Sequence, residues 1–246
     1  MMTSKPDEQI LCSLLFQTTS NYQKNLQTLL TLITDAKEGS IIVAPEVCLT
    51  GYDYDNFEAV AAFAPSAIEA IKRVSYNKII IFTLIEERDR EVFNFAKIFY
   101  NGNVVYERAK ARLFRFGNEH KYMSEGSDKE FEIVKVAGVK IAVFICFELR
   151  FKELWQMAEG ADVIAVPSWW GVARTENFKT LTNALAIMNQ CYVVSSDSLN
   201  TECSKMSGII KPNGEVTRNG NKPCLEVAFK TKDITLMRRY MDIGIE

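Results

Sequence analysis

Short apolar runs alternate with amphipathic segments along most of the chain. Runs rich in β-branched residues predict buried strands, and apolar residues spaced three or four positions apart predict helices that cover them. The predicted strands span residues 10–16, 40–44, 78–84, 92–100, 104–106, 140–146, 163–166, 192–196, 207–210 and 215–217. The predicted helices span residues 21–36, 58–74, 151–159 and 178–189. This order predicts an α/β fold in which helices pack outside a largely β interior.

Two turn sequences indicate hairpins, and no segment marks a domain boundary. Asn101-Gly102 joins two apolar runs, and so does Pro212-Asn213-Gly214; such dipeptides favour tight turns between strands. The chain contains no Pro/Ser-rich linker, internal repeat or low-complexity tract. We therefore expect residues 1–246 to form a single domain.

The composition narrows the class of protein. Hydrophobic residues make up 48% and charged residues 24% of the 246 residues, which is typical of a soluble globular protein. The net charge of -2 does not favour a nucleic-acid partner. No stretch approaches the roughly 18 apolar residues of a membrane span, and the first residues lack the apolar core of a secretory signal. These features predict a cytoplasmic protein without a membrane partner.

The cysteines and the single histidine argue against a metal site. The six cysteines include no CxxC pair, and one histidine leaves zinc few ligands. We expect no metal, and we interpret five of the six cysteines as buried free thiols in a reducing compartment. His120 lies in a charged loop, where a lone histidine is more often structural or exposed than catalytic.

Glu46 is the first residue with unusual chemistry. It directly follows an apolar strand and Pro45, at the edge where strand ends meet in α/β enzymes. Burial at such a place would raise its pKa toward that of a useful general base. The alternative is a carboxylate on a surface loop.

A charged segment at residues 106–126 is the second candidate. Lys110 follows a strand and would act there as a fixed cation for a developing oxyanion, while Glu119 would hold and tune that lysine. The alternative is a solvated charged loop, which the composition alone favours.

Cys146 is the third candidate, at the end of an apolar strand and the start of a predicted helix. A thiol at such a turn is exposed to a substrate, the backbone N–H of Phe147 faces the reacting carbonyl, and a helix N-terminus favours the thiolate. The alternative is a buried core cysteine.

In combination, the three segments resemble the nitrilase superfamily, also called the carbon–nitrogen hydrolases. The signature of that family is a glutamate, a lysine and a cysteine in this order, here Glu46, Lys110 and Cys146, and Glu119 falls where the family has a second glutamate. The resemblance extends from residue 17 to about residue 216. The neighbouring residues that match are Pro45, Thr50, Gly51, Tyr52, Tyr106, Leu113, Phe114, Leu149, Arg150 and Phe151.

The resemblance implies a fold and a reaction. The fold is a four-layer α-β-β-α sandwich, and two subunits pair through their helices as a homodimer. The family uses no metal or organic cofactor. Cys146 would be the nucleophile and Glu46 the proton carrier, Lys110 and the backbone N–H of Phe147 would bind the oxyanion, and Glu119 would orient Lys110.

Several positions depart from the family pattern. Arg112 stands where a histidine is common, and Glu148 stands where an aspartate usually follows the cysteine and an aromatic residue. Met188 occupies a place that often carries a glutamate, and Asp197 begins a run that usually starts with asparagine. The catalytic set is therefore intact, whereas several supporting positions are not standard.

The similarity is strongest to the short amidase-like branch, which includes ω-amidases. We expect Tyr52, Trp169, Trp170 and Arg174 to contact the substrate, with Arg174 pairing with a substrate carboxylate because a guanidinium matches a carboxylate in a bidentate way. A surface arginine is the alternative for Arg174. The predicted function is hydrolysis of a small amide, with release of ammonia through a cysteine thioester. The alternatives are hydrolysis of N-carbamoyl amides and a catalytically impaired binding protein.

Overall fold

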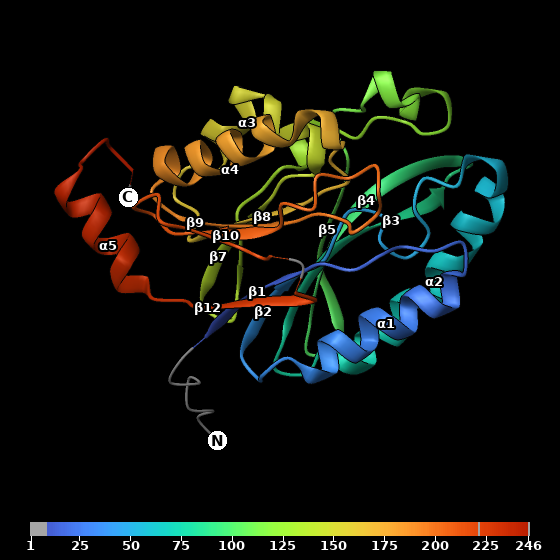
Figure 1. Cartoon of the computed structure of the whole chain (residues 1–246), viewed down its shortest axis with the longest axis horizontal. Coiled ribbons are helices and arrows are strands. Elements are labelled where there is room, and N and C mark those ends of the chain that lie inside the picture. The colour runs from blue at the N-terminus through green and yellow to red at the C-terminus, as the bar shows by residue number, and fades with distance from the viewer. Residues whose placement is uncertain (1–8, 221, 246) are drawn as a thin grey trace.

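Two six-stranded sheets lie face to face, with helices on both outer faces (Figure 1). The computed structural model describes residues 9–220 and 222–245. The strand order is β12-β1-β2-β3-β4-β5 in the first sheet and β11-β10-β9-β8-β7-β6 in the second. The four-layer α-β-β-α sandwich expected from the resemblance is confirmed.

The first sheet contains the N-terminal half of the chain and one strand from the C-terminal region. Neighbours β1, β2 and β3 run parallel, and the other pairings are antiparallel. Helices α1 (Tyr22–Asp35) and α2 (Phe57–Val74) cover its outer face. Asn21 caps α1, because its side chain accepts a hydrogen bond from the backbone N–H of Lys24 at 2.9 Å. The strands are β1 (Ile10–Leu14), β2 (Ser40–Val43), β3 (Ile79–Arg88), β4 (Glu91–Tyr100), β5 (Asn103–Ala109) and β12 (Cys224–Ala228).

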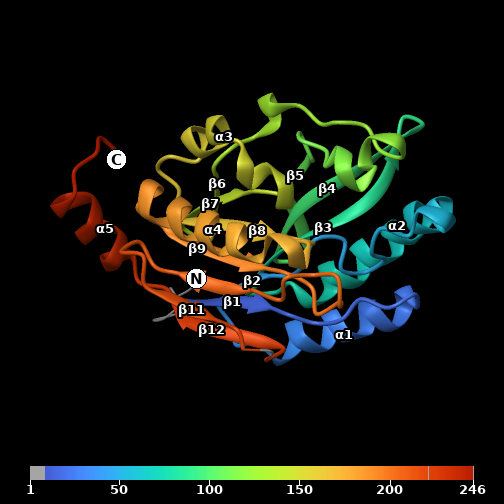
Figure 2. The same ribbon diagram turned by 45° about the horizontal axis from the view of Figure 1, so that its top comes forward.

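The second sheet repeats this plan. Neighbours β7, β8 and β9 run parallel, and α3 (Lys152–Met157) and α4 (Thr175–Asn189) cover the outer face. Helix α5 (Thr231–Tyr240) lies at one end of the sandwich (Figure 2). The strands are β6 (Val134–Val136), β7 (Val139–Val143), β8 (Val163–Pro167), β9 (Tyr192–Ser196), β10 (Gly208–Ile210) and β11 (Val216–Arg218). No helix within the described ranges is long and apolar enough to cross a membrane.

The facing sides of the sheets form one apolar core. Ile41 and Ile81 of the first sheet belong to the same buried cluster as Ile141, Val163 and Val194 of the second. The parallel strands are apolar on both faces, since each is covered by the other sheet on one side and by helices on the other. The carboxyl ends of β2, β7 and β8 lead into the segments that carry the candidate residues.

Most predicted elements are confirmed, and the differences have simple causes. Strand β9 has the predicted bounds, whereas the predicted strand 140–146 ends at Val143. The 3₁₀ turn Cys146–Arg150 follows it, so Cys146 does not open an α-helix directly. The prediction did not include β6, β12 and α5. Strand β6 is three residues long, β12 is only partly buried, and α5 is polar overall, with Ile234 as its buried residue.

Candidate active site

Glu46 is completely buried at the loop that follows β2. Its Oε1 atom accepts hydrogen bonds from Lys110 Nζ at 2.7 Å, the Tyr52 hydroxyl at 2.7 Å and Asn94 Nδ2 at 2.9 Å. Its Oε2 atom accepts a hydrogen bond from the backbone N–H of Trp169 at 3.1 Å. A surface-loop carboxylate would have no such set of donors, so this alternative for Glu46 is wrong.

Lys110 follows β5 and lies between two carboxylates. Its Nζ atom is 2.7 Å from Glu46 Oε1 and 2.8 Å from Glu119 Oε1. Glu119 lies in the 3₁₀ turn Glu119–Lys121 and also accepts the backbone N–H of Phe114 at 3.0 Å. The Tyr52 hydroxyl is 2.9 Å from Glu119 Oε1. One buried ammonium thus serves two glutamates, and Glu119 is not part of a solvated loop.

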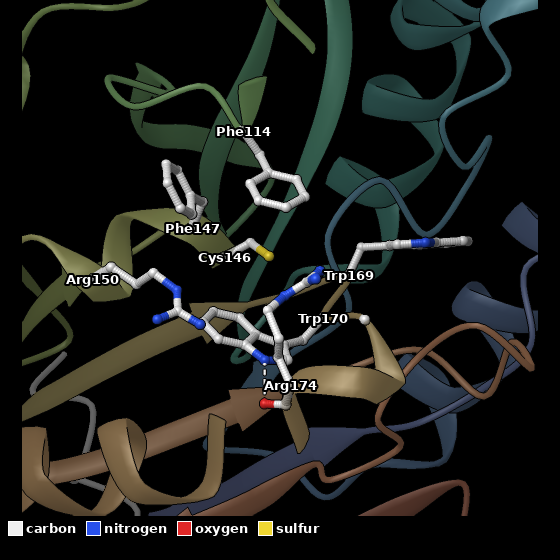
Figure 3. A pocket seen from close by; sticks show the side chains of 8 residues that line it. Phe114, Cys146, Phe147, Arg150, Trp169, Trp170 and Arg174 are labelled. Atoms are coloured by element: carbon white, nitrogen blue, oxygen red, sulfur yellow. Dashed lines mark hydrogen bonds between the residues drawn. The ribbon is translucent and has the colours of Figure 1, made fainter. Parts of the chain in front are cut away.

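Cys146 lies at a strained turn directly after the second-sheet strand β7. Its φ angle is 45°, in the left-handed region that side chains rarely adopt. Its side chain points into a pocket, and only 8% of the residue is exposed (Figure 3). Backbone strain of this kind persists only where the surroundings enforce it. The turn therefore has the geometry expected of a strand-end nucleophile.

A buried ion pair fixes this turn. Arg108 Nη1 donates to Glu148 Oε1 at 2.9 Å, and Arg108 Nη2 contacts Glu148 Oε2. The same carboxylate accepts the backbone N–H of Ile145 at 2.7 Å and that of Ala111 at 2.7 Å. Glu148, noted as a departure from the family pattern, thus ties the segment that carries Lys110 to the turn that carries Cys146. The sequence analysis missed Arg108, because nothing local links residues forty positions apart.

The electrostatics of the cluster determine where the protons reside. Burial raises the pKa of Cys146 well above its usual value, and the charge of Glu46 adds to this, while Lys110 opposes it. Burial also raises the pKa of Glu46 against the opposing charge of Lys110. Burial alone would lower the pKa of Lys110, but the charges of Glu119 and Glu46 outweigh it and raise that pKa.

These shifts bear on one expectation. The segment after Cys146 is a short 3₁₀ turn, which supplies little dipole, so Cys146 lacks the α-helix N-terminus expected to favour its thiolate. Burial instead raises the pKa of the thiol. Deprotonation of Cys146 therefore needs a base, and Glu46 is a carboxylate with a raised pKa in the same cluster.

The pocket beside Cys146 is small, with a cavity volume of about 20 Å³. Three of the expected substrate residues line it, namely Trp169, Trp170 and Arg174. The guanidinium of Arg174 lies 5.1 Å from the ring centre of Phe114, and no carboxylate in the described ranges forms an ion pair with it. The lining residues are Phe114, Cys146, Phe147, Arg150, Trp169, Trp170, Gly171 and Arg174 (Figure 3).

Tyr52 and His120 are not among the residues that line the pocket. The hydroxyl of Tyr52 contacts both glutamates of the cluster, so its direct neighbours are the proposed catalytic groups. His120 is exposed in the 3₁₀ turn next to Glu119. The expected contact of Tyr52 with substrate stays a prediction.

One group of potential metal ligands lies away from this site. The ligand atoms of Cys12, Cys224 and Glu226, on β1 and β12, are within 4.8 Å of one another. Glu226 also pairs with Lys37 at 3.5 Å. Because this group lies on the first sheet and contains no residue of the pocket, it has no part in the chemistry proposed below.

Comparisons with known proteins agree with this geometry. The sequence model described as Carbon-nitrogen hydrolase matches residues 11–239. The chain is 30% identical over 200 residues to 2-oxoglutaramate amidase of Bacillus subtilis (strain 168), and the match covers 76% of each protein.

Solved structures show the same fold. Nit3 of Saccharomyces cerevisiae, a member of branch 10 of the nitrilase superfamily, superposes with a TM-score of 0.84 at 18% identity and covers 97% of this chain and 96% of its own. A mutant amidase of Nesterenkonia, solved with the acetamide moiety of fluoroacetamide added at its active-site cysteine, has a TM-score of 0.79 at 18% identity, with 95% and 94% covered. The chain belongs to the carbon–nitrogen hydrolase family, that is, to the nitrilase superfamily.

Proposed function

We propose that the protein hydrolyses the carbon–nitrogen bond of a small amide through a thioester on Cys146. The observation that carries the proposal is the buried cluster of Glu46, Lys110 and Glu119 beside a pocket-facing thiol. A base, a fixed cation and a nucleophile in one dry site are the groups that acyl transfer requires. The covalent adduct on the cysteine of the Nesterenkonia amidase supports the same role for Cys146.

The acylation half-reaction follows from the positions of the groups. Glu46 accepts the thiol proton of Cys146 as sulfur attacks the carbonyl carbon, and the carbonyl oxygen becomes an oxyanion. Lys110 and the backbone N–H of Phe147 stabilise that charge, and loss of one such donor costs about 10²–10³ in rate. The carbon–nitrogen bond then breaks, Glu46 protonates the departing nitrogen, and ammonia leaves a thioester on Cys146.

Deacylation uses the same carboxylate again. Glu46 removes a proton from water as the water oxygen attacks the thioester, the carbon–sulfur bond breaks, and the proton returns to the sulfur of Cys146. Glu119 is a positioning residue in this scheme, since it touches Lys110 and the backbone N–H of Phe114. Both half-reactions balance without a metal or an organic cofactor.

The substrate class follows from the pocket walls. Arg174 faces the pocket and forms no ion pair with an acidic residue in the described part of the chain. A substrate carboxylate would supply the missing partner of its guanidinium. Trp169 and Trp170 supply flat apolar surface on the same side. We infer an ω-amide of a small carboxylic acid, in agreement with the 2-oxoglutaramate amidase of Bacillus subtilis. An N-carbamoyl acid also has an amide group at one end and a carboxylate at the other, and it is the second candidate.

Assembly and location are inferred separately. Helix α4 exposes Ile187 and Met188 on its outer side, and these exposed apolar side chains support a homodimer in which a second copy would bury them. All six cysteines are free, which supports a reducing cytoplasm. Light scattering, which gives the molar mass in solution, tests the homodimer. Hydrogen exchange then shows whether the amides of α4 are protected.

A substrate panel tests the function. Purified protein is incubated with 2-oxoglutaramate, glutamine, an N-carbamoyl amino acid and a nitrile, and ammonia release is measured with Cys146→Ser as the control. We expect the ω-amide to be hydrolysed, iodoacetamide to abolish the activity and chelators to leave it unchanged. Turnover of none of these compounds, together with tight binding of one, would favour the catalytically impaired binding protein.

A further inference from the structure

Asp197 is a completely buried carboxylate at the end of the second-sheet strand β9. No lysine or arginine in the described ranges forms an ion pair with it. Burial raises the pKa of this carboxyl to about 6, so it is ionised at pH 8. Burying a charge without a counter-ion is costly, and the contacts of Asp197 show what offsets that cost.

Three donors converge on the two oxygens of Asp197. Oδ1 accepts the backbone N–H of Trp170 at 2.9 Å. Oδ2 accepts the hydroxyl of Ser204 at 2.5 Å and the backbone N–H of Lys205 at 3.0 Å. A carboxylate is acceptor-only and satisfies all three, whereas an asparagine would turn an N–H₂ group toward one of the backbone donors. The site is therefore matched to an ionised aspartate.

The segment that Asp197 holds is the wall of the candidate active site. The backbone N–H of Trp169, one residue before the anchored Trp170, donates to Glu46 Oε2 at 3.1 Å. A hydrogen bond from the backbone of Trp169 also lowers the pKa of Cys146. The indole N–H of Trp170 donates to the backbone carbonyl of Arg174 at 2.8 Å. One peptide segment thus connects the proton carrier, the nucleophile and the pocket arginine.

The opposite side of this segment has its own support. The backbone N–H of Ser204 donates to the carbonyl of Trp170 at 2.7 Å, and Gly171 forms an antiparallel bridge with Cys203. These contacts fix the segment against the neighbouring loop. On either side of the N–H directed at Glu46, the backbone N–H of Ser168 donates to the carbonyl of Ser196 at 2.7 Å and that of Trp170 donates to Asp197. Among these acceptors Asp197 is the side chain, and therefore the one that a substitution can remove.

We propose that Asp197 is a positioning residue whose carboxylate holds the backbone of Trp170, so that the neighbouring N–H of Trp169 stays directed at Glu46 and Cys146. This inference rests on the proposed function, because it assigns Asp197 to the same site. Asp197 touches no reacting atom. It acts through the peptide N–H groups that it orders, and its charge supplies the strength of that contact.

The test compares Asp197→Asn with Ser204→Ala at pH 8. The asparagine is isosteric but cannot accept all three donors, whereas Ser204→Ala removes one donor on the side away from Trp170. Neither substitution changes the charged groups of the buried cluster and of the pocket around Cys146, which are Glu46, Lys110, Glu119, Arg150 and Arg174. Ammonia release gives kcat and KM, and iodoacetamide labelling over a pH series gives the pH midpoint of Cys146 alkylation.

We expect Asp197→Asn to lower kcat by about 10²-fold, because a misplacement of about 1 Å has an effect of this size. The alkylation midpoint of Cys146 should move to higher pH, since the hydrogen bond from Trp169 lowers its pKa. Ser204→Ala should lower the melting temperature while leaving kcat and the midpoint near those of the wild type. If Asp197→Asn does not fold, Asp197→Ser is measured in the same way.

Equal kcat values and equal midpoints in the two variants would overturn the inference and leave Asp197 with a purely structural role. The alkylation arm needs no substrate. Absence of ammonia release by the wild type would therefore overturn the proposed function, while a shifted midpoint in Asp197→Asn would still support the positioning role.

Discussion

Arg108 lies on strand β5, and Lys110 directly follows that strand. These two buried cations differ in the number of carboxylates that they contact. Arg108 pairs with a single carboxylate, Glu148, so its cluster is neutral. Lys110, two residues later, contacts both Glu46 and Glu119, so its cluster carries one excess negative charge. Both clusters lie at the same end of strand β5. We assign a structural role to the neutral cluster and a chemical role to the cluster with the excess negative charge.

The neutral pair keeps its protons fixed. Burial alone would lower the pKa of Arg108, but the charge of Glu148 outweighs it and raises that pKa. Arg108 therefore stays ionised, and the two oxygens of Glu148 that contact it also accept the backbone N–H groups of Ala111 and Ile145. In the unbalanced cluster, burial raises the pKa values of Glu46 and of the nearby Cys146. Proton transfer is easiest in the cluster where the carboxylates outnumber the cations.

The largest expected effect comes from removing the base of the unbalanced cluster. Glu46→Gln keeps the shape but cannot accept the thiol proton, and we expect turnover to fall by about 10²–10⁴-fold. The fold should persist, because Lys110 keeps Glu119 as its counter-ion. Ammonia release and circular dichroism check the two parts. Retained turnover in a folded variant would remove Glu46 from the mechanism.

Breaking the neutral pair should instead affect stability. Glu148→Gln leaves Arg108 buried without a counter-ion, and we expect the free energy of unfolding to fall by about 3–5 kcal/mol. Glu215→Gln is the matched control. Its carboxylate pairs with Lys211 and is 56% exposed, so the loss should be about 0–1 kcal/mol. Urea denaturation measures both, and equal losses would contradict the structural role of Glu148.

Glu119, the second glutamate of the unbalanced cluster, allows a test of whether its position matters as well as its charge. Glu119→Asp keeps the charge but withdraws the carboxylate from Lys110 and from the backbone N–H of Phe114. We expect kcat/KM to fall by about 10²-fold, because the oxyanion donor is then misplaced. The kinetics of the folded variant on the amide that the panel identifies provide the test. Wild-type kinetics would contradict a positioning role of Glu119 in catalysis.

The smallest effect is a shift in pH dependence. Because burial raises the pKa of Glu46, the base is protonated as the pH falls through a value above the usual 4.5, and activity is lost on that acid side. The charge of Glu119 contributes to this rise. Glu119→Gln should therefore move the acid limb of kcat/KM to lower pH. A limb that stays in place or moves upward would show that another group controls it.

The sequence predicted the elements with strong apolar periodicity and the residues that belong to motifs. Strand β9 and helix α1 followed from patterning, and the approach of Glu46, Lys110 and Cys146 followed from the resemblance. The ion pair between Arg108 and Glu148 could not be predicted, because it joins two sheets and depends on the tertiary register. The same holds for Asp197, whose donors come from two loops.

The pKa shift of Cys146 also could not be predicted from the sequence. The expected helix dipole depended on an α-helix, but the chain forms a 3₁₀ turn there. Burial, which no local pattern reports, is the largest cause of the raised pKa of the thiol. The sequence therefore predicted the candidate reacting groups, and the structure shows the burial that shifts their pKa values.

Peptide mapping of the protein quenched in acid during turnover tests the central claim most directly. The account predicts that the peptide containing Cys146 gains the mass of the acyl group of the substrate, and that Cys146→Ser lacks both this adduct and ammonia release. An adduct on Cys48 or Cys203 instead, or full ammonia release by the Cys146→Ser variant, would contradict the thioester mechanism.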